Sequence, residues 1–379
     1  MLEGQIRNDA RFEQKLDSRA LASKGDRAPA TREGLDISLV STLAYDSNIF
    51  IEAEDETASL VAQVEPTIGW TGGERDKTWV RLAYEGAAVV YFSETEESRF
   101  DNRVRVEGGV RGKQLALAYS ARWARVGSPT PDVGGQITRQ EWGGEASVSY
   151  NPKGKLSYRV FGERSAVELD DPDLIDLFQV SGGIAAEYDY SSKTQLELSY
   201  RLGQVDIDQS GSQNFHRVLL QGLWTPREKI RVSVQAGAEY RDYEVGSELD
   251  PYFVARVDWT PRAKTGLYLE AYRREESSTA LEGESFELTG LRAGVTQRFR
   301  DGWSGAFELG GEHSDYFGIT GLPESGREDN LFFVRPSVTY SLAEDSEIAF
   351  VYQWTRSSSN EAEFGFTNHQ LGVSLNHRF

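Results

Sequence analysis

The 379-residue sequence contains no cysteine, one methionine and four histidines. The missing cysteines exclude disulfide frameworks, cysteine-based zinc sites and thiol nucleophiles. The histidines (His216, His313, His369 and His377) are scattered along the chain, which makes a histidine-rich metal site improbable. We therefore expect no metal and no other cofactor.

Basic residues are also scarce, since 41 Lys and Arg face 60 Asp and Glu, for a formal charge of −19. Nucleic-acid binding depends on neutralising phosphates with Lys and Arg, so we expect no nucleic-acid partner. No apolar run approaches the roughly 18 residues that a membrane-spanning helix needs. A chain of this length suggests two or three soluble domains. The periodicity of the sequence contradicts that expectation.

Apolar and polar residues alternate from Gly34 to Phe379 in runs of about ten positions that end at turn signals. One run has Ile230, Val232 and Val234 on one parity, and Arg231, Ser233 and Gln235 on the other. A period of two gives each strand one apolar and one polar face. We count eighteen such runs, the first near Leu35–Tyr45 and the last near Thr367–Phe379.

The connections between the runs alternate between short and long. Short ones include Ser191–Lys193 and Arg300–Gly302, and long ones include Asp46–Thr57, Gly127–Ile137 and Tyr316–Asn330. This pattern predicts an all-β fold, a single closed antiparallel transmembrane β-barrel of about 18 strands with long outer loops and short periplasmic turns. A soluble propeller would need a shared blade signature. A β-sandwich would not explain the residues found at the two ends of each apolar stripe.

Aromatic residues cap that stripe at both ends, as in the girdles of a lipid-facing barrel. One set lies beside the short turns (Trp70, Tyr150, Tyr190, Trp224, Trp259, Phe299, Trp303, Tyr340 and Phe379), and a second lies towards the long loops (Tyr45, Phe92, Trp142, Phe178 and Trp354). Ordinary β-propensity also favours aromatics in strands, but it does not place them at strand ends.

The opposite face is charged, and so many charges cannot be packed in a dry core because burying them unpaired costs several kcal/mol each. Eighteen strands enclose an aqueous channel, so we predict that this face lines a pore. The predicted pore-wall residues are Arg81, Glu85, Arg103, Arg105, Glu107, Arg122, Glu145, Arg159, Glu163, Glu187, Glu197, Arg201, Arg231, Glu239, Arg256, Asp258, Glu270, Arg292, Glu308 and Arg335. Both signs are interspersed, which favours a solvated, mutually paired wall over a selectivity ladder.

Six aromatics share the inward parity (Trp79, Phe161, Tyr252, Tyr268, Tyr272 and Phe333). They are candidates for contacts with sugars, although packing of the inner wall explains most of them better. The long loops are acidic, as at Glu52–Glu56 and Glu168–Asp173. They either stand free in solvent or bind divalent cations that bridge lipopolysaccharide, and we expect outer-membrane lipid and lipopolysaccharide as partners.

The last strand places Leu371, Val373, Leu375 and Phe379 on one face. This arrangement resembles the C-terminal signal that the barrel assembly machinery recognises, although His377 replaces a frequent aromatic. Residues 1–33 are rich in charge and show no signal peptide, so we expect a signal that this chain no longer carries. We predict that 1–33 forms a periplasmic tail, with a luminal plug as the alternative, and that 34–379 forms the barrel in a bacterial outer membrane.

The stretch Ala44-Tyr45-Asp46-Ser47-Asn48-Ile49-Phe50, the strand count and the terminal Phe379 together resemble an outer-membrane β-barrel porin family associated with exopolysaccharide export gene clusters. The resemblance implies a porin-like channel that serves exopolysaccharide export across the outer membrane of Gram-negative bacteria, with a periplasmic export partner. It carries over no catalytic residue.

Three alternatives stay open. A general diffusion porin would show a constriction loop folded inward, for which Tyr316–Asn330 is long enough. A structural or adhesive barrel would bind polymers or cations through its acidic loops and have no transport role. An outer-membrane enzyme would need positioned catalytic groups, and His313 beside Glu312 and Asp315 is the only local candidate, so we expect no enzyme.

Overall fold

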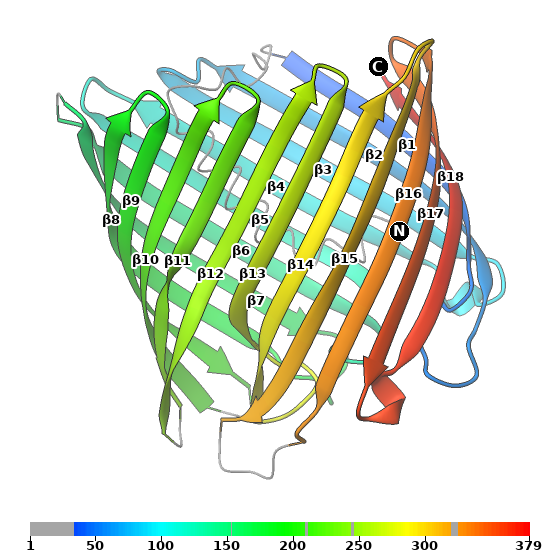
Figure 1. Ribbon diagram of the computed structural model, residues 1–379. Helices are drawn as coiled ribbons and strands as arrows, with labels where there is room; N and C mark the ends of the chain where they lie inside the picture. The colour runs from blue at the N-terminus through cyan, green and yellow to red at the C-terminus, as the bar shows by residue number, and fades with distance from the viewer. Residues whose placement is uncertain (1–33, 153, 209–210, 244–245, 320–324) are drawn as a thin grey trace.

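The computed structural model describes residues 34–152, 154–208, 211–243, 246–319 and 325–379. The expected tail, 1–33, lies outside the described residues. Eighteen strands form one antiparallel sheet in chain order, and the pairing of the first strand with the last closes it into a barrel (Figure 1). The predicted fold class and strand count are therefore confirmed.

The strand bounds follow the predicted runs closely. They are β1 Gly34–Asp46, β2 Ser59–Gly73, β3 Thr78–Tyr91, β4 Arg99–Arg111, β5 Leu115–Thr130, β6 Gly135–Tyr150, β7 Leu156–Leu169, β8 Leu177–Ser191, β9 Thr194–Ile207, β10 Gly211–Arg227, β11 Ile230–Asp242, β12 Ser247–Arg262, β13 Thr265–Ser277, β14 Glu284–Arg298, β15 Trp303–Gly318, β16 Glu328–Ala343, β17 Ser346–Ser359 and β18 Phe366–Arg378. Two short 3-10 segments, η2 Thr95–Glu97 and η3 Ala362–Phe364, lie in loops. Within the described ranges, no helix is long and apolar enough to cross a membrane.

The alternation of the sequence becomes an inside and an outside. On β11, Val234 and Tyr240 are each 39% exposed on the outer surface, whereas Glu239 and Arg241 are buried on the inner one. Because every strand pairs on both sides, the sheet has no free edge, which is the condition for crossing a bilayer with strands. The outer surface is thus apolar and the inner surface is charged.

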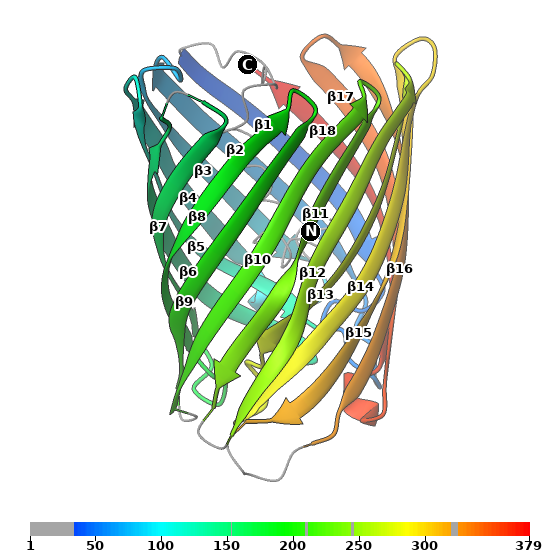
Figure 2. The same ribbon diagram turned by 60° about the vertical axis from the view of Figure 1, so that its left-hand side comes forward.

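The two ends of the barrel differ, as Figures 1 and 2 show. Tight turns and the C-terminus lie at the upper end, and the longer loops lie at the lower end. Gly302 supplies a left-handed conformation (φ +81°) in the turn between β14 and β15, where residues with a Cβ are strained. Exposed aromatics mark both ends, with Trp224 and Trp259 beside the turns and Phe92 towards the loops.

The stretch Gly127–Ile137, which was predicted to be a long loop, is mostly a paired extension of the wall. β5 and β6 stay in register up to the pair of Thr130 with Gly135. The neighbouring strands do not reach as far towards the long-loop end. β4 pairs with β5 no further than Arg125, and β7 pairs with β6 no further than Arg139. We call residues 127–138 the β5–β6 hairpin tip; glycines and prolines in it gave the sequence signals of a loop.

The motif of the first hairpin seals the seam between β1 and β18. Asn48 is fully buried, and its side-chain amide donates to the carbonyl of Glu52 (2.8 Å) and that of Thr367 (3.3 Å). Asn368 donates to the carbonyl of Asn48 (3.1 Å), and Gln370 donates to the carboxylate of Asp46 (2.6 Å). Side chains thus add to the backbone ladder where the chain meets its own far end.

Candidate functional site

The interior of the barrel holds a cavity of about 820 Å³. Seven of the predicted pore-wall residues line it, all but one of them from β3, β4 and β5, namely Arg81, Glu85, Arg103, Arg105, Glu107, Arg122 and Arg292. Apolar residues such as Val126 and Phe333 line it as well. The site is therefore a polar cleft inside the barrel, and it is richest in arginine along β3 to β5.

Much of the remaining wall is neutralised by ion pairs between strands. Arg159 of β7 lies 2.7 Å from Glu197 of β9, and Arg201 of β9 lies 2.7 Å from Glu163 of β7. These pairs reach across β8 because the residues of β8 beside the arginines are small, Ala185 next to Arg159 and Gly183 next to Arg201.

The same pairing continues around the barrel. Arg335 contacts Glu308 (3.0 Å), and Arg256 contacts both Asp258 and Glu270 (3.1 Å each). Further pairs join Arg81 to Glu107 (3.5 Å), Arg105 to Glu107 (3.8 Å), Arg217 to Glu239 and Arg292 to Glu312. A wall with this much internal compensation supports the paired-wall interpretation of the sequence.

The register of the strands places three further predicted pore-wall residues. Glu145 lies opposite Ser120 and Glu163, Glu187 opposite Ser157 and Glu197, and Arg231 opposite Asp258. They share the inner face through the register of their strands. That any of the twenty residues lines a conducting path stays a prediction.

Arginines cover the inward aromatics. The guanidinium carbon of Arg256 lies 4.5 Å from the ring centre of Tyr268, and that of Arg217 lies 4.8 Å from the ring centre of Tyr252. The same cation–π contact occurs at Trp79, Phe161, Tyr272 and Phe333. Because Phe161, Tyr272 and Phe333 are also buried, packing describes these three better than stacking on a sugar.

The β5–β6 hairpin tip crosses the long-loop end of the barrel and contacts the opposite side. The carboxylate of Asp132 accepts hydrogen bonds from the Ser278 hydroxyl (2.9 Å) and from the backbone N–H (2.7 Å) and hydroxyl (2.9 Å) of Thr279. It also accepts one from the Tyr316 hydroxyl (3.1 Å). In the 18-strand ring these partners stand eight strands away from the hairpin, so the tip spans the mouth.

Arg327 fixes the tip from the opposite side. It is fully buried, and it donates to the carbonyls of Asp132 (2.8 Å) and Pro131 (2.9 Å) while it pairs with Asp329. Its guanidinium carbon lies 3.4 Å from the ring centre of Phe364. We call the set Asp132, Arg327 and Asp329 the mouth clasp.

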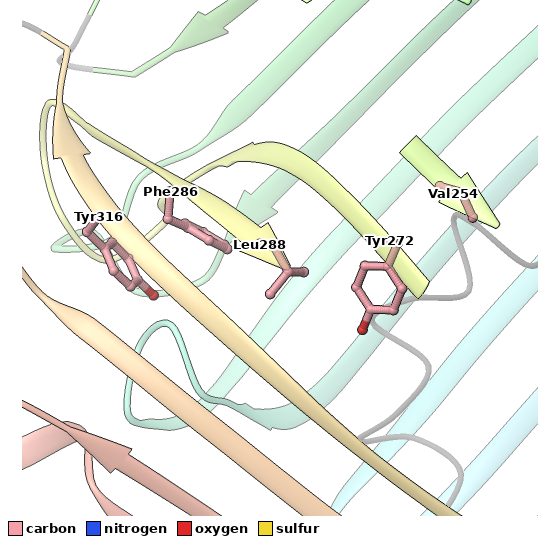
Figure 3. Packing of buried hydrophobic residues seen from close by; sticks show 5 residues of the cluster. All are labelled: Val254, Tyr272, Phe286, Leu288 and Tyr316. Atoms are coloured by element: carbon pink, nitrogen blue, oxygen red, sulfur yellow. The ribbon is translucent and has the colours of Figure 1, made fainter. Parts of the chain in front are cut away.

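Apolar packing beside the mouth clasp supports it. Phe286 and Tyr316 pack with ring centres 4.8 Å apart, and Leu288, Tyr272 and Val254 continue the cluster along the inner wall (Figure 3). A second cluster joins the loop-side ends of β9 and β10 to the loops around the mouth and includes Ile175, Ile207 and Ile319.

The loop between β7 and β8 reaches the same region, since the N–H of Ile175 donates to the carbonyl of Thr279 (3.0 Å). Tyr243, in the loop after β11, packs against this second cluster, and burial together with the nearby Glu275 carboxylate raises the pKa of its hydroxyl above the ordinary value. The mouth is thus narrowed by packed side chains from several loops. Residues 320–324 of the candidate constriction loop, Tyr316–Asn330, lie outside the described residues, and in the described part of the chain the β5–β6 hairpin tip crosses the mouth.

The only enzyme-like group of the sequence is divided between two faces. His313 bonds to Asn330 on the outer surface (3.1 Å), whereas the neighbouring Glu312 pairs inward with Arg292. Adjacent residues of a strand point to opposite faces, so Glu312 cannot act together with His313. Asp315 shares the outward parity of His313. Among the described residues, no group of His, Asp and Glu is arranged to hold a metal ion.

The predicted assembly-signal residues all face outward. Leu371 is 59% exposed and Phe379 is 73% exposed, with Val373 and Leu375 between them on the same face. His377 bonds to the Ser346 hydroxyl (2.8 Å) and packs edge-on against Phe379. Recognition by the assembly machinery stays a prediction.

Sequence reasoning missed several residues of the site. Arg217 shares the inward parity of Phe215 and Leu219, so the alternation would have found it. Arg327 and Asp132 lie in turn-rich stretches, and their partnership joins positions 195 residues apart. No pattern in the sequence indicates such a contact.

Comparisons with known proteins point to the same class of protein. Residues 236–379 match a family model described as "Putative beta-barrel porin 2". No curated protein matches the sequence.

Solved structures with a similar fold include OccK2 (OpdF) of Pseudomonas aeruginosa, which is 12% identical and has a TM-score of 0.53 over 91% of this chain and 98% of that one. The same protein in complex with glucuronate has a TM-score of 0.51 at 12% identity, over 91% and 98% of the two chains. OccAB4 of Acinetobacter baumannii gives 0.47 at 12% identity, over 93% and 100%. The barrel of OccK2 shares the fold of this chain, and the C-terminal part of the chain is similar to a porin family.

Proposed function

We propose that this protein is an outer-membrane channel for polar solutes, and more narrowly that it serves the export of an acidic exopolysaccharide. The observation that carries the proposal is the combination of an apolar outer surface with a charged inner wall around a cavity. Charged side chains at this density need water or partners. Here ion pairs between strands supply partners, and the adjoining cavity has room for water.

The arginines of β4 and β5 support an anionic solute. Arg105 and Arg122 lie directly opposite each other in the register of the two strands, with Arg103 on the same face. Like charges placed opposite each other are destabilising. Glu107 offsets part of this repulsion through its contact with Arg105, and an anionic solute would offset more. The glucuronate bound by the similar barrel of OccK2 is an acidic sugar, and an acidic polysaccharide offers the same carboxylates in series.

A general diffusion porin is the second candidate, and the β5–β6 hairpin tip favours it. A segment that crosses the mouth and is fixed by the mouth clasp narrows the entrance. Such a constriction would pass small solutes and stop a polymer, unless the hairpin swings aside. The two candidates therefore differ in whether the tip moves.

Single-channel conductance of the refolded protein in a planar bilayer, with and without residues 1–33, tests the proposal. A steady conductance that acidic oligosaccharides interrupt more often than neutral ones of equal length would support an acidic saccharide channel. Equal interruption by both would support the diffusion porin. No conductance from either form would refute the diffusion porin and leave either an export channel that opens only with its periplasmic partner or a structural or adhesive barrel.

The partners of the export proposal are a periplasmic export protein and the barrel assembly machinery. The short turns, which face the periplasm in a barrel of this type, are basic at Arg111, Lys113 and Lys155. They would suit an acidic surface of an export partner. Co-purification of the two proteins from membranes, abolished by Glu at these three positions, would support that contact.

A further inference from the structure

Arg164 is a cation on the surface that faces lipid. It lies on the outward parity of β7, on the same face as Val160, which is 61% exposed. Its neighbours across the sheet are Gly144 of β6 and Val180 of β8. An arginine facing lipid costs about 2–4 kcal/mol at the bilayer midplane and about 0–1 kcal/mol near the interface, so its position requires a reason.

Two aromatic rings hold the Arg164 guanidinium in place. Its central carbon lies 4.7 Å from the ring centre of Trp142 and 4.7 Å from that of Phe178, and the two rings are 6.0 Å apart. Gly144 opposite leaves room for the side chain. Within the described part of the chain no residue accepts a hydrogen bond from Arg164, so its donors are free to bind an acceptor from outside.

Arg125, an exposed residue of β5, adds a second cation to this part of the outer surface. Its Nη2 lies 2.8 Å from a carboxylate oxygen of Asp170, with 52% of its side chain exposed. The Trp142 indole N–H donates to Glu168 (3.3 Å). Both nearby carboxylates therefore have partners of their own, and they border the site on the loop side. We call Arg125, Trp142, Arg164 and Phe178 the outer arginine patch.

We infer that the outer arginine patch binds the phosphate of a phosphorylated lipid of the outer leaflet, of the lipid A type. The patch lies where the apolar belt gives way to the long loops, which is the level of the headgroups. Guanidinium groups match phosphate in geometry and form strong charge-assisted hydrogen bonds with it. Exposed apolar residues next to Arg164 offer a surface for acyl chains, with Val180 beside it on β8 and Val160 further from the loops on β7.

This inference rests on the outer-membrane placement of the barrel and not on transport. Native mass spectrometry of the detergent-solubilised full chain with added lipid A tests it. The variants are Arg125→Gln/Arg164→Gln and, as a matched control, Arg356→Gln, which alters an exposed arginine at the loop end of β17 that has no pair of rings around it. Heat-modifiable mobility on a gel reports whether each variant is folded.

We expect the wild type and the control to keep one bound lipid A, and the double variant to keep it about tenfold less, because hydrogen bonds to charged groups are lost. Lipid A without its phosphates should bind the wild type as weakly as phosphorylated lipid A binds the double variant. Equal retention by all three folded proteins, or equal retention of both lipids, would overturn the inference. Unchanged conductance of the double variant separates this outcome from a failure of the channel proposal.

Discussion

Single residues determine how this barrel is sealed and how its mouth is narrowed. Asn48 and Arg327 are both fully buried, and both join segments far apart in the sequence. Neither belongs to the alternating pattern from which the strands were predicted. Their consequences can be tested by conservative changes that leave the strands intact.

Asn48→Ala should destabilise the closure of the barrel. The change removes the bonds to the carbonyls of Glu52 and Thr367 and leaves buried acceptors without donors, at a cost of about 1–3 kcal/mol. We expect a lower guanidinium midpoint for unfolding of the refolded protein. Asn376→Ala is the control, because Asn376 also lies on β18 but its side chain makes an exposed hydrogen bond, to Glu347 of β17. An unfolding midpoint for this control as low as that of Asn48→Ala would contradict the prediction.

Arg327→Met should loosen the mouth. The variant keeps the aliphatic bulk but removes the donors to Pro131 and Asp132, which costs about 1–3 kcal/mol and corresponds to a roughly 5- to 150-fold shift between docked and free hairpin. Single-channel recordings should show a larger or noisier open level. Arg300→Met, in an exposed short turn, should leave the recordings unchanged.

Entire elements show how far the sequence alone predicts the fold. Alternation and turn signals gave the number of strands and nearly all their bounds, because the two faces of each strand meet lipid and lumen respectively. The β5–β6 hairpin tip was predicted as a loop, and its direction was not predicted at all. Its inward bend depends on partners 146 to 196 residues away, and such tertiary contacts leave no local periodicity.

An engineered cross-link tests whether the β5–β6 hairpin tip moves. The sequence has no cysteine, so Asp132→Cys/Thr279→Cys introduces the only pair of thiols at side chains that now touch at 2.9 Å. We expect the oxidised protein to conduct steadily at the lower level and the reduced protein to show the larger level. The conductance of the single variant Asp132→Cys should not change with the oxidant. Identical traces for the oxidised and reduced forms of the double variant would show that the tip does not gate the channel.

The whole molecule separates its charges by location. The inner wall is largely compensated by ion pairs, so much of the formal charge of −19 must lie elsewhere. Exposed carboxylates occur in the long loops, for example at Glu54, Asp55, Asp171 and Asp173. The rim of the mouth therefore carries a negative field that the wall does not.

This distribution predicts a weak cation preference that depends on salt. Screening extends about 10 Å at 0.1 M ionic strength but only about 3 Å at 1 M, so reversal potentials under a KCl gradient should favour cations at low salt and approach neutrality at high salt. Replacing the four loop carboxylates by their amides should remove the low-salt preference. A preference that persists unchanged in that variant would place its origin in the wall.

The pairing of β1 with β18 also makes the order of the strands circular. The N–H of Phe379 donates to the carbonyl of Ile37 (2.9 Å), so a short linker from Phe379 to Gly34 and a cut at the turn after Ser191 would preserve every neighbour in the ring. We expect such a circular permutant to refold in detergent, as measured by heat-modifiable mobility. In cells it should fail to reach the membrane, because its C-terminus no longer ends in Leu375 and Phe379. The permutant thus separates the sequence information that specifies the barrel fold from the C-terminal signal that directs its assembly in the cell.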